Sequence, residues 1–150
     1  MIKRRSAHGE FILPVSAADA IGFFTPEGER DWVPGWNPIY PEGEASETPG
    51  TVFTTAHGHV QIVWVIHHID RAEGSAAYSR ITPGHHAGTV RVRCTDQESC
   101  RCAVTVDYEM TALTDGNPTA LDAYDEASFE TMMEQWATMV AGILSPENQP

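Results

Sequence analysis

The chain has 150 residues, of which 41% are hydrophobic and 20% charged, a composition typical of one globular domain rather than of a disordered segment. Its formal net charge of −12 argues against partners such as nucleic acid or an anionic membrane, because both would repel it. No apolar run approaches the roughly 18 residues of a membrane span, and the N-terminus lacks the apolar region of a signal peptide, so we expect a cytoplasmic protein.

The first predicted elements are a strand and two short helices. Residues 10–15 form the strand, which a proline closes, and Ser16 follows as the N-cap of a helix over 17–24. Thr25 then caps a second helix, with proline at its first position and a glutamate in its first turn. This helix runs to about Trp32, before a Pro-Gly pair.

A series of strands occupies the middle of the chain. A brief strand at 37–40 and a loop at 41–50 come first. Valine, threonine, tyrosine and isoleucine then dominate five runs that sheet positions favour: 51–55, 60–69, 77–82, 89–95 and 101–112. The short spacings between these runs require antiparallel hairpins. Apolar and polar residues alternate in the last two runs, so one face of the sheet is apolar and needs a cover.

The last predicted element is a long amphipathic helix from about Pro118 to Leu144, with Asn117 as its cap. Its apolar residues fall within about one third of the circumference at 100° per residue. They are Leu121, Phe129, Met132, Met133, Trp136, Met139, Val140 and Ile143. This helix is the only long one available to cover the apolar face of the sheet.

Several segments resemble the START-like superfamily, also called SRPBCC, in particular its polyketide cyclase/dehydrase-like bacterial members. These segments are 32–38 (WVPGWNP), 49–53 (PGTVF), 82–84 (TPG), 108–113 (YEMTAL) and 129–133 (FETMM) followed by Trp136. The resemblance covers nearly the whole chain. It implies a single α+β domain over residues 1–150 with the helix-grip fold. In that fold a curved antiparallel sheet of about six to seven strands wraps around the C-terminal helix, and two short helices follow the first strand. It also implies a cavity between sheet and helix, without a universal catalytic set.

Six aromatic and aliphatic side chains are candidates for contact with a ligand in that cavity. Phe129, Met133 and Trp136 belong to the apolar arc of the helix, and Tyr108 belongs to the apolar face of the last strand. We expect Trp136, Met133 and Tyr108 to line an apolar cavity. Trp32 and Trp36 form either an aromatic wall at its mouth or packing anchors for their loop.

Three further candidates are polar. Tyr78 and Arg80 share one face of their strand, and an inward Arg80 could bind a carboxylate of the ligand. Asp125 falls near the centre of the helix's apolar arc. One reading makes Asp125 a ligand contact or a general base whose pKa is raised by burial. The other places it in water, on a helix end that extends beyond the sheet.

The sequence predicts no cofactor and no metal. His57, His59, His85 and His86 occupy turns expected at the same end of the sheet, but they match no standard zinc spacing, and turn histidines are usually solvated. Cys94, Cys100 and Cys102 are odd in number and clustered, which is no disulfide framework. No phosphate-binding loop or nucleophile motif is present.

Three functions remain open on this basis. The first is binding of a small hydrophobic molecule, lipid-, polyketide- or aromatic-like, in the cavity, as the function of a carrier or sensor. The second is an enzyme of the cyclase/dehydrase type, which two or more inward carboxyl, imidazole or phenol groups would favour. The third is a co-chaperone-like interaction domain with a filled core. The oligomeric state is equally open, a homodimer being one of its options.

Overall fold

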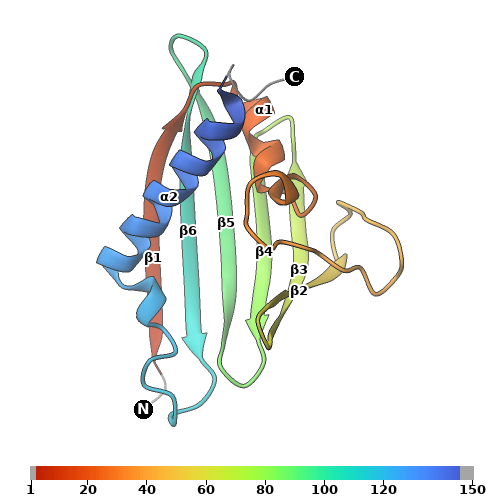
Figure 1. Cartoon of the computed structure of the whole chain (residues 1–150), viewed down its shortest axis with the longest axis vertical. Helices are drawn as coiled ribbons and strands as arrows, with labels where there is room; N and C mark the ends of the chain where they lie inside the picture. The colour runs from red at the N-terminus through yellow and green to blue at the C-terminus, as the bar shows by residue number, and fades with distance from the viewer. Residues whose placement is uncertain (1–2, 146–150) are drawn as a thin grey trace.

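The computed structural model describes residues 3–145. Its six strands form one antiparallel sheet in the order β1-β6-β5-β4-β3-β2. Their bounds are β1 Arg4–Leu13, β2 Val52–His57, β3 Val60–Asp70, β4 Ser75–Thr82, β5 His86–Gln97 and β6 Arg101–Ala112. The sheet curves around one side, on which all the helices lie (Figure 1). This is the predicted helix-grip architecture, and the fold prediction is confirmed.

The first two short helical segments follow β1 as predicted. They are the helix α1 (Ala17–Ala20), which continues into the 3-10 turn η1 (Ile21–Phe24), and the 3-10 turn η2 (Gly28–Asp31). Ser16 caps α1 by accepting a hydrogen bond from the Asp19 N–H at 3.2 Å. The Thr25 hydroxyl accepts from the Gly28 N–H at 3.1 Å and donates to the Gly22 carbonyl at 2.8 Å. A side chain at Gly28 would collide with that same carbonyl, so glycine lets η2 pack directly on η1.

The long helix α2 (Glu126–Leu144) begins eight residues after the predicted start. The segment before it turns through η3 (Asp122–Tyr124), which buries Ala120, Leu121 and Tyr124 against the sheet. Asp125 is the true N-cap, and its side chain accepts from the Ser128 N–H at 2.7 Å. The cap predicted at Asn117 is therefore wrong, whereas the end of the helix at Leu144 is confirmed.

Helix α2 crosses the concave face of the sheet diagonally and lies closest to β1 (Figure 1). The contact is tight at Gly9, where a side-chain carbon would collide with Met133. Phe129, Met133 and Val140 are the buried residues of the helix. The apolar face of the amphipathic helix therefore covers the sheet, as its periodicity predicts.

Three strand predictions differ most from the structure. The first strand, predicted at 10–15, is β1 and spans Arg4–Leu13. The brief strand expected at 37–40 is a single bridge, in which Ile39 pairs with Thr54. The strand predicted to start at Thr89 starts instead at His86, because the β4–β5 turn is shorter than the histidine-rich sequence suggests. His86 is consequently a buried strand residue with 6% exposure rather than a solvated turn residue.

Candidate functional site

A small cavity, partly open to the outside, lies between the sheet, η1, η2 and α2. Its volume is about 20 Å³, which is room for about one water molecule. Nine residues line it: Phe24, Glu29, Phe53, Trp64, Tyr78, Val90, Val92, Tyr108 and Trp136. Trp136 and Tyr108 are therefore at the cavity as expected, and Tyr78 joins them, but Met133 does not. The interior is filled mainly by aromatic rings rather than by a wide apolar space.

Glu29 is the one acidic residue of the cavity wall, and the sequence analysis missed it. Its backbone is fixed in η2, where its N–H donates to the Thr25 carbonyl at 3.0 Å and its carbonyl accepts from Val33 at 2.9 Å. The side chain is partly buried, and its carboxyl group has no hydrogen bond or salt bridge to the described residues. Burial therefore raises the pKa of Glu29 to about 8. The group is a neutral carboxylic acid at pH 7.

Two tyrosines face the cavity from neighbouring parts of the sheet. The Tyr78 hydroxyl donates to the Phe24 carbonyl at 2.6 Å and so is already satisfied by the protein. The Tyr108 ring packs edge-on against Phe129, with 5.3 Å between centroids, and is 6% exposed. Burial raises the pKa of Tyr108, with smaller electrostatic effects from Arg80 and Glu29. The hydroxyl of Tyr108 has no bond to the described residues, so it and the Glu29 carboxyl are the polar groups available inside the cavity.

Arg80 points to the inner side of the sheet, the orientation in which it could bind a ligand carboxylate. Its guanidinium lies 5.4 Å from the centre of the Trp64 ring and donates to His86 Nε2 at 2.9 Å. No carboxylate of the described residues forms a salt bridge with it. Arg80 thus lies behind the Trp64 wall, without direct contact with the cavity itself.

A polar network continues from Arg80 to the start of α2. Because an arginine can only donate, His86 Nε2 carries the lone pair, which also accepts from the Tyr124 hydroxyl at 3.0 Å. The proton is then on His86 Nδ1, which donates to His85 Nδ1 at 2.6 Å. Burial, together with the charge of Arg80 and the His85 ring, lowers the pKa of His86 to about 4. This imidazole is neutral at physiological pH.

Trp32 and Trp36 act as packing anchors, the second of the two readings of their sequence. Their indole N–H groups donate to the carbonyls of Phe23 and Pro26, both at 2.7 Å. Trp32 packs edge-on against Trp136 at 5.5 Å and Trp36 against Trp64 at 5.7 Å. Neither lines the cavity, but each supports a residue that does.

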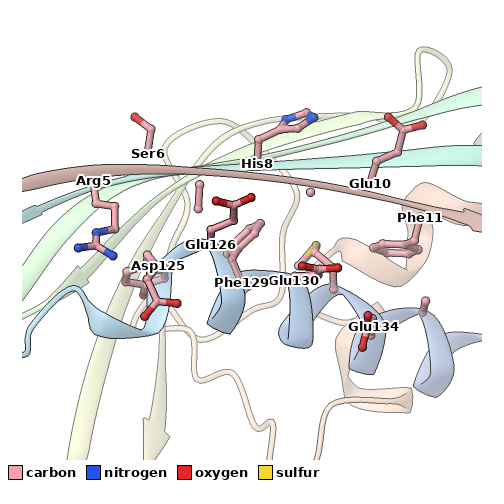
Figure 2. Close-up of a pocket in the computed structure, with 15 residues that line it drawn as sticks. Arg5, Ser6, His8, Glu10, Phe11, Asp125, Glu126, Phe129, Glu130 and Glu134 are labelled. Carbon is pink, nitrogen blue, oxygen red and sulfur yellow. The ribbon is translucent and has the colours of Figure 1, made fainter.

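The other predicted residues lie at a separate groove on the outside, between β1 and α2 (Figure 2). Its volume is about 730 Å³. Phe129 and Met133 close its floor, and Asp125 lies at one end, where the hydrogen bond from Ser128 lowers its pKa. Along its rim, α2 presents the carboxylates of Glu126, Glu130 and Glu134. Asp125 is thus a helix cap on the outer surface, and the raised pKa considered for it is wrong.

The histidines at 57, 59, 85 and 86 are not grouped as metal ligands. Within residues 3–145, no group of three or more histidine, cysteine, aspartate or glutamate side chains is arranged to hold an ion. The buried thiols of Cys94 and Cys102 are free, as is the exposed Cys100. No helix of the described chain is both long enough and apolar enough to cross a membrane.

Once the burial of its neighbours is known, the spacing of Glu29 accounts for its position. Thr25, Glu29 and Trp32 are spaced at i, i+4 and i+7, and both Thr25 and Trp32 are buried. Glu29 therefore belongs to the inward side of its segment. For His86, only the strand register shows that it pairs with Ala112 in the sheet.

Solved structures with the same architecture support the fold. A truncated norcoclaurine synthase from Thalictrum flavum has a TM-score of 0.68 at 11% identity, over 97% of this chain and 96% of that chain. The Mll3558 protein from Rhizobium loti has a TM-score of 0.68 at 16% identity, over 93% and 99%. Ara h 8.0201 has a TM-score of 0.67 at 13% identity, over 94% and 95%. These likenesses confirm the helix-grip fold that the resemblance implies.

Neither a protein-family model nor a curated protein matches this chain by sequence. The geometry of the cavity therefore carries the functional argument.

Proposed function

We propose that the chain binds a small, mainly apolar molecule in the cavity at Glu29 and Tyr108. The observation that carries this proposal is the Glu29 carboxyl, which faces an aromatic enclosure without a partner from the described residues. A carboxyl group held among aromatic rings loses part of its hydration, and no hydrogen bond from the described residues compensates for that loss. A filled-core interaction domain would have no reason to keep one, whereas a ligand with a hydrogen-bonding group would satisfy it.

Binding must enlarge the cavity, because its present volume of about 20 Å³ holds little more than a water molecule. Trp136 is the side chain best placed to move. It is only half-buried, and it stacks on Phe24 at 6.0 Å between centroids. Its indole N–H has no hydrogen bond to the described residues, unlike those of Trp32, Trp36 and Trp64. Rotation of this ring would open the cavity toward the outside of α2.

Trp136→Ala tests the proposal through a neutral fluorophore, N-phenyl-1-naphthylamine. We expect the parent protein to bind the fluorophore and its tryptophan emission to be quenched, and the variant to bind it more tightly because the ring no longer fills the opening. Ala137→Gly, on the same helix but outside the cavity, serves as the control. A stability loss of about 3–5 kcal/mol without fluorophore binding by either protein would contradict the proposal and favour a filled core.

A second candidate is an enzyme that uses acid–base chemistry in the same cavity. Two groups able to transfer protons, Glu29 and Tyr108, line the same cavity, and the pKa of Glu29 is raised to about 8, near working pH. The Kemp elimination of 5-nitrobenzisoxazole would measure this capacity, since the Glu29 carboxylate would take the ring C–H proton as the N–O bond breaks. Catalysis that rises with pH toward about 8 and disappears in Glu29→Gln would support the enzyme. Equal rates in both proteins would exclude Glu29 as a base.

A further inference from the structure

The cavity combines two features that recognise a positive charge. Six of its nine lining residues are aromatic: Phe24, Phe53, Trp64, Tyr78, Tyr108 and Trp136. The faces of such rings carry negative potential and attract cations, most strongly where water is excluded. The only acidic side chain of the wall, Glu29, lies among them.

From this arrangement, and resting on the proposed function, we infer that the ligand is an amine whose ammonium group sits in the aromatic enclosure against the Glu29 carboxylate. The present volume of about 20 Å³ suits an ammonium head group, which is similar in size to a water molecule. The remainder of the ligand would take the space opened by Trp136. The net charge of −12 also favours the approach of cations over anions.

No resident cation of the described residues takes the place of this ammonium group. The positive groups nearest in sequence and space are engaged elsewhere. Arg30 donates to Glu27 at 2.9 Å, and Arg71 forms a double hydrogen bond with Glu47. Arg80 donates to His86 from behind Trp64. The cavity therefore presents an acid without a counter-ion.

Binding of an ammonium ion must change the protonation of Glu29. In the empty cavity the carboxyl is neutral at pH 7 because burial raises its pKa to about 8. When the cation enters, the carboxylate becomes the favoured form, so one proton leaves to solvent for each ammonium bound. Affinity should then rise about tenfold per pH unit below about pH 8 and level off above it.

Glu29 is the one group around the cavity that is expected to titrate between pH 6 and 8. From the sheet, Tyr78 and Tyr108 face it, and burial raises the pKa of both far above this range. The other strands and α2 contribute Phe53, Trp64, Val90, Val92 and Trp136, which do not titrate. On its own segment, Glu27, Arg30 and Asp31 are exposed, and Arg30 pairs with Glu27. The pH dependence of cation binding between pH 6 and 8 should therefore report Glu29.

Calorimetric titration with three ligands of one shape tests the inference. They are 2-phenylethylamine, the neutral 2-phenylethanol and the anionic 3-phenylpropionate. In buffers of different ionisation enthalpy we expect the amine to bind at least tenfold more tightly than the alcohol at pH 8, with release of about one proton at pH 6.5. Glu29→Gln should lose this preference, and Asp31→Asn, from the same 3-10 turn, should keep it.

Each other outcome is decisive. Equal or tighter binding of the alcohol or the propionate would overturn the amine inference but leave the proposed binding function standing. Absence of binding by all three ligands, together with no fluorophore binding, would overturn both. Amine binding that is the same in Glu29→Gln would place the cation at another site and also overturn the inference.

Discussion

At the scale of single residues, Glu29 couples the stability of the protein to pH. Its pKa is raised from 4.5 in the unfolded chain to about 8 in the folded protein. Between these two values the folded state keeps a proton that the unfolded chain has released. The free energy of unfolding therefore falls as pH rises through this window, by up to about 1.4 kcal/mol per pH unit. Below pH 4.5 both states are protonated and the dependence ends.

We expect Glu29→Gln to remove this slope and to be more stable than the parent at pH 8, because an amide needs no deprotonation. Urea unfolding from pH 5 to pH 9 would measure the difference. The exposed Asp31→Asn should follow the parent curve. Parallel curves for the parent and Glu29→Gln would show that the carboxyl titrates as it does in the unfolded chain.

Single residues also show where sequence reasoning is weakest. The aromatic residues Tyr108 and Trp136 could be placed at the cavity because each lies on the apolar side of a regular element. Glu29 and His86 could not be placed as directly, because a short 3-10 turn and a strand end carry too few residues to establish a face. A charged residue type also argues for solvent until its neighbours in space are known.

At the scale of elements, the interface between β1 and α2 depends on one glycine. Gly9 has no room for a side chain because Met133 occupies the space above it. Gly9→Ala should lower the free energy of unfolding by about 1–3 kcal/mol through overpacking. The same change in a Met133→Ala background should cost less, because the obstructing side chain is gone. Equal losses in both backgrounds, measured by urea unfolding, would place the strain in the β1 backbone instead.

Local sequence signals predicted the order of the helices and strands, but they did not predict where α2 begins. Periodicity, the Ser16 cap and short hairpin spacings act locally, and the structure confirms what they predict. The cap predicted at Asn117 does not form, and Asp125 caps α2 instead. Burial of Leu121 and Tyr124 draws the intervening segment into η3. The position of the cap therefore depends on tertiary packing, which no local signal carries.

At the scale of the whole molecule, two buried groups give opposite pH dependences. The pKa of His86 is lowered from 6.5 to about 4, so its contribution to stability is lost as pH falls from 6.5 to 4, where only the unfolded chain gains the proton. Titration of Glu29 has the opposite effect and lowers the free energy of unfolding as pH rises from 4.5 to about 8. The two slopes cancel between pH 4.5 and 6.5, and Glu29 alone acts above 6.5.

The stability curve should therefore be flat from pH 4.5 to 6.5 and decline toward pH 8. His86→Asn should convert the flat part into a continued rise as pH falls, because the opposing histidine is absent. His59→Asn, at an exposed turn, should leave the profile unchanged. Thermal unfolding across this range checks the shape, and an unaltered plateau in His86→Asn would show that His86 does not titrate in the folded protein as its burial implies.

The sheet has two free ends, β1 and β2, which do not pair with each other. A closed barrel could widen only by breaking hydrogen bonds between strands, because every strand has two neighbours. Here α2 and the short helical segments lie across the sheet between the two margins (Figure 1), and they hold it by side-chain packing and by a few hydrogen bonds, such as that from Tyr78 to the Phe24 carbonyl. Widening the grip bends the sheet and leaves each of its five ladders intact. We therefore expect the sheet to widen across its strands, the direction in which the proposed ligand would enlarge the interior.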